Sequence, residues 1–378
     1  MDGILTSTRI KTKIAELTGI VPLAHDVCIN SCLTFTGPFA QLLECPTCNE
    51  PQFDPQTELP HQQFHTIPIG PQLQVLWWSA EGAKDIWHHS QHTTVILKQI
   101  CHDNGVITVY DDIYHGRDYL SAVEQGDIEL DDMVLMLSID SVQLYAKKQS
   151  DCWIYIWIIL DHVPASRYIK KLVVPGTFIL GPNKPKNADS FLYPSLHHLA
   201  TLQKEGLKIW DVQEDWIFTL YPFSTADGPG MTYLNGLVGH QSAFSCRLYC
   251  PIKGRHKPGT NHYYPALLCP NNYSVQGCDH NDVDPYHILL MSVDEYTQNL
   301  AYVIASPNDT QYKTCHKETA ISKPSIFSGL PGNCMLGIPG CFPADLMNLV
   351  SLNLTDLFLS LWCGTLECEG PDSRATGD

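Results

Sequence analysis

Two aspartates stand where strands are expected to end. Asp140 closes the apolar run MVLMLSID, and Asp227 follows another apolar run in the segment TADGPG, where two glycines allow a sharp turn. Carboxylates at strand exits of one sheet can converge on a divalent cation, and their hard oxygens suit Mg²⁺ or Mn²⁺. Two such ions can hold the attacking and leaving oxygens of a phosphodiester. The alternative is that Asp140 caps the following turn and Asp227 is a loop residue.

Four cysteines near the start form two close pairs. Cys28 and Cys32 make the first pair, and Cys45 and Cys48 make the second, after twelve intervening residues. Each pair fits on one turn, and two facing turns present four thiolates in the tetrahedral arrangement that zinc prefers. We therefore expect a structural zinc site, with four buried free thiols as the alternative.

A looser group of cysteines and histidines follows Asp227. Its members Cys246, Cys250, His256 and His262 could hold a second zinc, although no C-x2-C spacing is present. The same segment holds the densest basic and aromatic patch, which could grip phosphates and stack an unpaired base, or could be an ordinary solvated loop. The basic residues of this patch are Arg247, Lys253, Arg255 and Lys257.

Residues 73–132 carry many histidines and aspartates. His88 and His92 lie four residues apart in a plausibly helical stretch and could in principle hold a metal, but no glutamate accompanies them in an HExxH pattern. We expect these histidines to form a solvated helix face. The acids that follow, among them Asp111 and Asp112, are expected to be solvated charges and turn formers.

The elements that position Asp140 and Asp227 follow from the apolar pattern. Short β-rich runs predict three strands, leucines spaced three and four apart predict a helix, and a fourth strand comes after it. The expected strands are 133–139, 153–160, 171–180 and 216–222, and the expected helix is 188–209. This order is typical of an α/β sheet whose active edge lies at the strand ends. Residues 50–72, rich in Pro and Gln, indicate a linker.

The composition narrows the classes of function. With 378 residues, 44% of them hydrophobic and 17% charged, the chain is typical of a globular protein. Its longest apolar run, 152–160, is too short for the roughly 20 residues of a bilayer-spanning helix. The net charge of −17 repels nucleic acid, so any DNA contact must be local. No secretory signal is seen, so we expect a nuclear or other intracellular protein whose fifteen cysteines are thiols or metal ligands.

Four longer segments of the chain resemble one family when they are taken together. They are LMLSIDSVQLYAKKQSDCWIYIWIILD, FILGPNKPKNADSFLYPSLHHLATLQKEGLKIWD, TADGPGMTYLNGLVGH and IPGCFPADLMNLVSLNLTDLFLSLWCGTLEC. In this order they closely resemble the transposases of fungal Plavaka elements, in the CACTA (En/Spm) superfamily. The cysteine segment HDVCINSC…ECPTC also looks like that family's N-terminal cysteine segment. The likeness extends over about residues 20 to 368.

The resemblance implies a ribonuclease H-like mixed sheet with flanking helices, using an acidic triad with Mg or Mn to cut and rejoin DNA at transposon ends. Asp140 matches the family's first catalytic aspartate and Asp227 its second. The family's D-x-x-H motif corresponds to Asp345-Leu-Met-Asn348, so asparagine replaces histidine. No residue matches the third acid, for which Asp356 and Glu367 are the nearest candidates.

These observations lead us to expect a transposase-derived protein that has lost catalysis and is incomplete at Asp378. A non-catalytic DNA- or protein-binding remnant is the alternative, and a metal-dependent hydrolase of a small substrate is a third hypothesis. Its partners would be DNA and further copies of itself, without a membrane. The expected domains are a zinc-ribbon-like module (1–60), a linker and helical region (61–132), the first part of the core (133–228), a Cys/His-rich insertion (229–338), a D-x-x-H-like helical segment (339–368) and a disordered tail (369–378).

Overall fold

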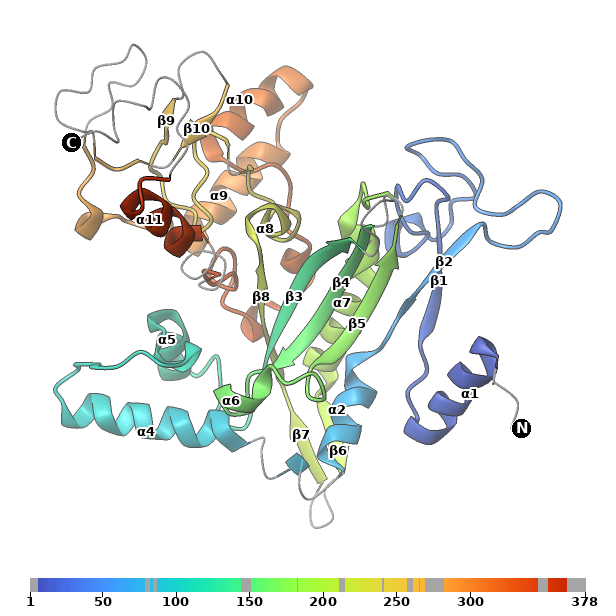
Figure 1. Ribbon diagram of the computed structural model, residues 1–378, viewed down its shortest axis with the longest axis horizontal. Helices are drawn as coiled ribbons and strands as arrows, with labels where there is room; N and C mark the ends of the chain where they lie inside the picture. Colours follow the sequence, from blue (N-terminus) through green and yellow to red (C-terminus); the bar gives the residue numbers. More distant parts are fainter. Residues whose placement is uncertain are drawn as a thin grey trace. The chain divides into compact units, whose positions relative to one another are not determined.

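The chain folds into two compact units in the computed structural model (Figure 1). The described residues are 6–78, 82–83, 87–143, 151–181, 183–210, 215–239, 241–256, 261–264, 266–268, 282–345 and 353–365. The first unit combines Met1–Ser224 with Ile326–Cys341, and the second combines Thr225–Ser325 with Phe342–Asp378. The long stretch of the second unit is therefore inserted between two stretches of the first.

A six-stranded mixed sheet is the framework of the first unit, with strand order β1-β2-β5-β4-β3-β8. The pairs β1/β2, β2/β5, β5/β4 and β4/β3 are antiparallel. Strand β8 runs in the same direction as β3, because Met133 N donates to Thr219 O near one end and Ser224 Oγ donates to Leu137 O further along. The strands are β1 Leu23–Val27, β2 Gln62–Thr66, β3 Met133–Gln143, β4 Asp151–Ile159, β5 Val174–Leu180 and β8 Leu220–Ala226.

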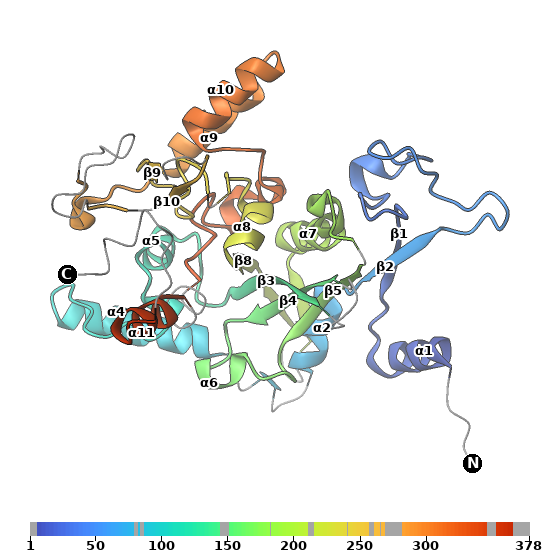
Figure 2. The same ribbon diagram turned by 45° about the horizontal axis from the view of Figure 1, so that its top comes forward.

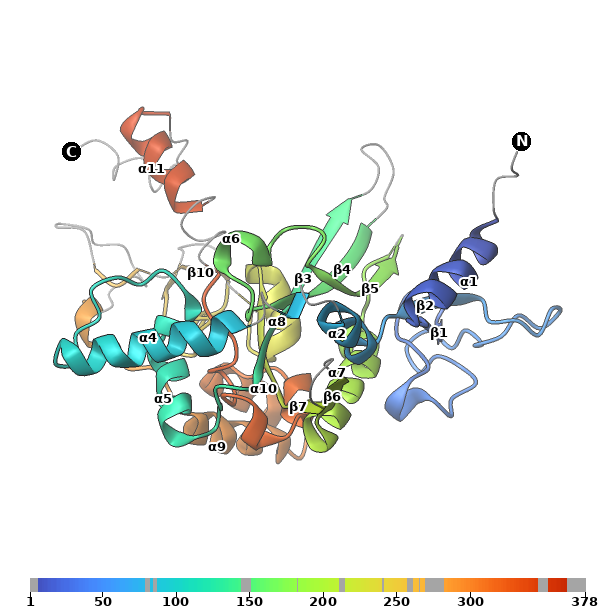
Figure 3. The ribbon, with the colours of Figure 1, turned by 90° about the horizontal axis from the view of Figure 1, so that it is seen from below.

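Both faces of this sheet are covered by helices. Strands β3 and β4 therefore have apolar residues at successive positions and do not alternate between apolar and polar residues. Helix α7 (Ala188–Glu205) lies along one face (Figure 2). There Ser195 Oγ is hydrogen-bonded to the buried Tyr155 hydroxyl. Helices α4 (His88–His102) and α5 (Arg117–Gln125) pack on the other face (Figure 3). There the core includes Val134 and Met136 of β3.

The remaining elements of the first unit are short. A separate hairpin, β6 with β7, follows α7. The bounds are α1 Ser7–Thr18, η1 Gly37–Phe39, α2 Ile69–Trp77, η3 Ile113–His115, α6 Pro164–Arg167, β6 Leu207–Trp210, β7 Asp215–Phe218, η5 Ile326–Gly329 and η6 Gly332–Cys334.

The second unit has its own small core around Tyr249, with four α-helices and one two-stranded ladder among its described residues. The Tyr249 hydroxyl donates to Thr319 O and accepts from Asn299 Nδ2. Gly236, with φ of 71°, ends α8 where a Cβ would collide with Lys323 O, so only glycine fits. The elements are α8 Gly228–Asn235, β9 Arg255–His256, β10 Tyr263–Tyr264, η4 Pro285–His287, α9 Val293–Ile304, α10 Asp309–Thr319 and α11 Thr355–Trp362.

The expected α/β class is confirmed as a mixed sheet with flanking helices, and three strands and the long helix lie close to their predicted positions. The predicted strand at 216–222 is wrong, since it divides into β7 and β8. The predicted linker at 50–72 is also wrong, because β2 lies within it and buries Phe64 and Thr66. None of the described helices has the length and apolar character needed to cross a membrane. The expected tail at 369–378 lies outside the described residues.

Candidate functional site

The four N-terminal cysteines come together in the first unit, as their spacing predicts. The Sγ atoms of Cys28, Cys32, Cys45 and Cys48, called the four-cysteine cluster below, all lie within 4.8 Å of one another. Those of Cys28 and Cys48 are 3.4 Å apart. Four sulfurs bound to zinc at ~2.3 Å would lie roughly 3.8 Å apart in a tetrahedron, so only small movements separate this cluster from zinc geometry.

Two turns aim these thiols inward. In the first, Ser31 has a φ of 53° and its N–H donates to Cys28 O. In the second, Asn49 has a φ of 59° and its N–H donates to Cys45 O at 2.8 Å. Asparagine is among the residues that tolerate this left-handed conformation best, so the chain can double back directly after Cys48.

The surroundings of the four-cysteine cluster shift the pKa values of its thiols in opposite directions. Burial raises the pKa of Cys28 to about 12. Burial also raises the pKa of Cys48, but hydrogen bonds from the Glu50 backbone, Asn30 and the Cys28 and Cys45 thiols outweigh it and lower that pKa to about 6. Zinc binds cysteine as the thiolate, so a zinc ion in the cluster would displace the protons of the remaining thiols and compensate the negative charge of the four sulfurs.

The module that carries the four-cysteine cluster is tied to the start of helix α7. Asn187 N donates to Cys32 O at 2.8 Å, and Thr34 N donates to Ser190 Oγ at 3.0 Å. The Thr34 hydroxyl also donates to Ser190 O at 2.8 Å. A metal in the four-cysteine cluster would thus fix the end of the helix that covers the sheet, which is a structural role.

The structure places Asp140 and Asp227 differently from the sequence prediction. Asp140 is exposed and lies inside β3, which continues to Gln143, so it does not close the strand. Its Oδ1 accepts from Ser141 N at 2.7 Å. Asp227 caps α8, with its Oδ1 accepting from Gly230 N at 2.7 Å.

Neither unit by itself contains both aspartates. Asp140 belongs to the first unit and Asp227 to the second. Among the described residues, no group of three potential metal ligands includes either of them. The predicted acid pair therefore stays a prediction.

The ligands of the second predicted zinc site do not come together in the part of the chain that the structure describes, so that site stays a prediction. Cys246, Cys250, His256 and His262 are all described, yet they do not gather their ligand atoms. The reason is local pairing. His256 lies in the β9/β10 ladder with its ring against Tyr263, and a hydrogen bond from Cys250 lowers the pKa of Cys246 to about 6.

The basic patch loses one of its predicted phosphate contacts. Arg255 is only 1% exposed, and its guanidinium donates to Ala266 O and to Asp282 Oδ1, each at 3.2 Å. The prediction that Arg255 binds DNA is therefore wrong. Lys253 is exposed with its Nζ over the Tyr263 ring, and Arg247 is half-buried.

The structure places two of the other predicted residues in the second unit. Asp356 is exposed in the first turn of α11, and Asp345 lies in a loop four residues after Cys341, the last residue of the first unit. Lys257, Asn348 and Glu367 lie outside the described residues.

Sequence reasoning missed a buried polar network beside the sheet. His89 is buried, not solvated: its Nε2 and the Tyr119 hydroxyl are 2.6 Å apart, and its Nδ1 is 3.1 Å from Asp132 O. Asp161, two residues after the end of β4, accepts from Val134 N at 2.9 Å. Burial lowers the pKa of His89 to about 4 and raises the pKa of Asp161 well above its ordinary value.

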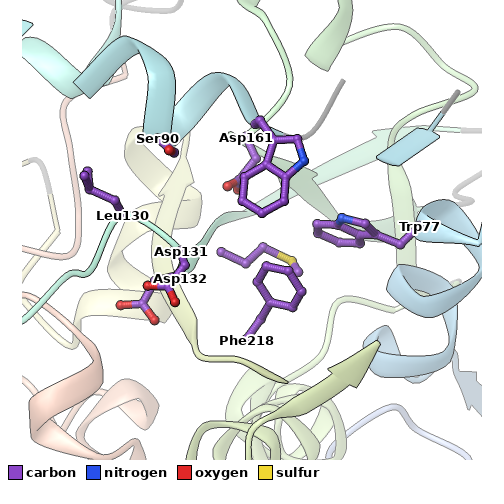
Figure 4. A pocket seen from close by; sticks show the side chains of 9 residues that line it. Trp77, Ser90, Leu130, Asp131, Asp132, Asp161 and Phe218 are labelled. Carbon is purple, nitrogen blue, oxygen red and sulfur yellow. The ribbon is translucent and has the colours of Figure 1, made fainter. Parts of the chain in front are cut away.

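A small pocket adjoins this network (Figure 4). Asp132 and Asp161 border it together with the aromatic rings of Trp77 and Phe218. Burial raises the pKa of Asp132 to about 6. The pocket thus combines apolar walls with two carboxyl groups whose pKa values are raised. In the sequence, Asp132 precedes the apolar run of β3 and Asp161 follows that of β4, and these positions could have indicated that both acids are buried.

Asp112 is also buried, contrary to expectation. The guanidinium of Arg167 binds both of its carboxylate oxygens, at 2.7 and 2.9 Å, and both side chains are almost fully buried. Such a fork-shaped pair fixes η3 against α6.

Comparison with known proteins adds no family. No family model matches the chain, and no curated protein matches it, so the resemblance noted above stays a prediction.

Proposed function

We propose that the chain is a transposase-derived DNA-binding protein with a ribonuclease H-like core. The observation that carries this proposal is the strand arrangement within the first unit. Strands β3, β4 and β5 form an antiparallel series, α7 follows, and β8 then lies beside β3 in the same direction. Neighbouring strands that run in the same direction end at one edge of a sheet, which is where such sheets bind ligands.

The proposal gives the two aspartates one task. In the resemblance noted above, Asp140 matches the family's first catalytic aspartate and Asp227 its second. Both would supply hard oxygen ligands to one Mg²⁺ or Mn²⁺ ion. Without a third acid a second ion would be held weakly, and in-line displacement on DNA needs both ions positioned. We therefore propose DNA binding without cleavage at a meaningful rate.

The four-cysteine cluster supports this proposal by its role at the start of α7, where zinc would stabilise the core. With a net charge of −17, DNA binding must rest on a few local cations such as Arg247 and Lys253. The logarithm of the DNA-binding constant would then fall only gently with the logarithm of the salt concentration, because few phosphates are contacted.

The test uses the full chain, a labelled DNA duplex, a supercoiled plasmid and Mn²⁺. We expect salt-sensitive DNA binding, one Mn²⁺ ion that Asp140→Asn and Asp227→Asn each remove, and no plasmid nicking. Asp118→Asn is the matched control, because Asp118 is an exposed acid of α5 in the first unit.

Two results would contradict the proposal. The proposed function would be overturned if the chain did not bind DNA and if Asp140→Asn and Asp227→Asn both left Mn²⁺ binding unchanged. Nicking that disappears in Asp140→Ala would show that the chain is catalytic, and it would direct attention to Asp356 or Glu367 as the missing ligand.

A further inference from the structure

A second group of potential metal ligands lies in the first unit, between helix α4 and the short helix η3. It consists of His92, Asp111 and His115, called the His-Asp-His cluster below, whose ligand atoms lie within 4.8 Å of one another. Asp111 Oδ1 is 3.3 Å from His115 Nδ1 and 3.8 Å from His92 Nε2. The sequence spreads these residues over two elements, so no short motif reveals them.

The distances fit a small tetrahedral ion. Nitrogen and oxygen ligands bound to zinc at ~2.0–2.1 Å lie roughly 3.3–3.4 Å apart when the angle between them is tetrahedral. The separation between Asp111 and His115 already has this value, and a small rotation of the exposed Asp111 side chain would shorten the other.

His115 gives an independent reason to expect a ligand. The residue is 5% exposed, and its Nδ1 is inaccessible to solvent and makes no hydrogen bond. This nitrogen faces Asp111 Oδ1 without the geometry of a hydrogen bond. Leaving a buried ring nitrogen unpaired is unfavourable, and a bond to a cation between the two residues would satisfy it.

The neighbouring groups leave Asp111 available as a metal ligand, whereas Asp112 is already occupied. His88, His92 and Asp112 also lie within metal-binding reach of one another, but Arg167 already occupies both oxygens of Asp112. A cation at Asp112 would meet the positive guanidinium. Asp111, in contrast, is 64% exposed at its side chain and reachable from solvent.

His88 holds the cluster in place. Its ring stacks on that of His92 with centroids 4.9 Å apart, and its Nε2 is 3.3 Å from Asp112 Oδ2. The buried pair of Asp112 and Arg167 therefore fixes His88, and the stacked His88 ring limits the movement of the His92 ring.

We propose that His92 Nε2, Asp111 Oδ1 and His115 Nδ1 bind a divalent ion of the zinc class. Two imidazoles and one carboxylate are a donor set that zinc favours, whereas Mg²⁺ and Ca²⁺ prefer oxygen alone. Three protein ligands leave a fourth position for water or an anionic ligand on the side of Asp111 that faces solvent. This site is separate from the four-cysteine cluster and does not depend on the proposed function.

The experiment measures zinc and cobalt binding by the full chain after exhaustive metal removal under reducing conditions. We expect two tightly bound ions in the unaltered chain and one in Asp111→Asn. Cobalt separates the two sites, because the four-cysteine cluster gives thiolate-to-cobalt charge-transfer absorption and the His-Asp-His cluster gives only weak ligand-field bands. Asp111→Asn and His92→Gln should remove the weak bands and leave the charge-transfer absorption unchanged.

The control is Asp103→Asn. Asp103 forms an exposed pair with His102 at the other end of α4, with 2.6 Å between Nδ1 and Oδ1. This pair contains the same side-chain types without a third ligand, so its variant should keep both ions. Asp111 is exposed, so its replacement by asparagine leaves the fold intact, which circular dichroism verifies.

Three results would overturn the inference. The first is a single ion in the unaltered chain, with thiolate absorption alone. The second is that both Asp111→Asn and His92→Gln keep two ions. The third is that Asp103→Asn loses an ion just as Asp111→Asn does, which would indicate nonspecific binding to surface histidines.

Discussion

Burial shifts the pKa values of Asp132 and His89 in directions that have opposite consequences for stability. The pKa of Asp132 rises to about 6, so the folded chain binds a proton there that the unfolded chain has already released. Its unfavourable contribution is absent below pH ~4 and complete above pH ~6. The pKa of His89 falls to about 4, so the folded state resists protonation and stability decreases as the pH drops from ~6.5 toward 4.

Asp132→Asn should therefore stabilise the protein at pH 7.5 and have little effect at pH 4. The expected gain at pH 7.5 is about 1–2 kcal/mol, because each pKa unit corresponds to ~1.4 kcal/mol and solvent screens part of the charge of this partly exposed group. Asparagine keeps an oxygen that can accept the hydrogen bond from Glu129 N, now 2.8 Å from Asp132 Oδ2. Urea denaturation at both pH values measures the effect, with Asp118→Asn, an exposed acid of α5, as control. An equal gain at pH 4 and pH 7.5 would refute the assignment to Asp132 ionisation.

At this scale the sequence predicted local groups and missed distant ones. The four-cysteine cluster was foreseeable because each pair lies on one turn and spacing alone brings its thiols together. Asp112 and Arg167 are 55 positions apart, and nothing near either residue reveals that they form a buried pair. The same reasoning explains His115, whose importance appears only when α4 and η3 lie together.

Among the elements, the module around the four-cysteine cluster is expected to depend on metal. Cys45→Ser should remove one zinc ion and lower the melting temperature, because three thiolates and a hydroxyl hold zinc poorly and the Cys32 and Thr34 contacts to α7 lose their support. Zinc content and thermal melting of the full chain measure both effects. Cys101→Ser is the control, since Cys101 is an exposed thiol of α4. Unchanged zinc content in Cys45→Ser would contradict a metal at the four-cysteine cluster.

The predictability of the elements followed their hydrophobic periodicity. Strands β3, β4 and β5 and helix α7 have long apolar patterns, and their positions were predicted closely. Strand β2 was missed because only two of its residues, Phe64 and Thr66, are buried, amid a segment rich in Pro and Gln. Strands β7 and β8 were merged because only Thr219 separates them, so the apolar run passes from one to the other without a turn signal.

At the scale of the whole molecule, the two units should unfold separately. Each has its own buried core, and chains with several cores depart from a two-state transition. Calorimetry should therefore resolve two transitions, one for each unit.

Two substitutions assign those transitions. Gly176→Ala places a Cβ against the buried Tyr155 ring and should destabilise the first unit by about 1–3 kcal/mol. Tyr249→Phe removes the hydroxyl between Asn299 and Thr319 and should destabilise the second by about 1–2 kcal/mol. Gly332→Ala, with no atom within 4 Å of the added Cβ, is the control. Both variants lowering one shared transition would show that the units unfold together.

The insertion of one unit within the other has a consequence for synthesis on the ribosome. Ser224 N donates to Cys341 O, and the buried Gln203 amide donates to both Leu220 O and Cys334 O. Residues 326–341 are translated only after the whole inserted stretch 225–325. While the nascent chain grows through that stretch, Cys341 and Cys334 have not yet been made. Ser224 N in β8 then lacks its acceptor, and the Gln203 amide can donate only to Leu220 O. The first unit to begin emerging from the ribosome is therefore completed only after the inserted stretch has been made.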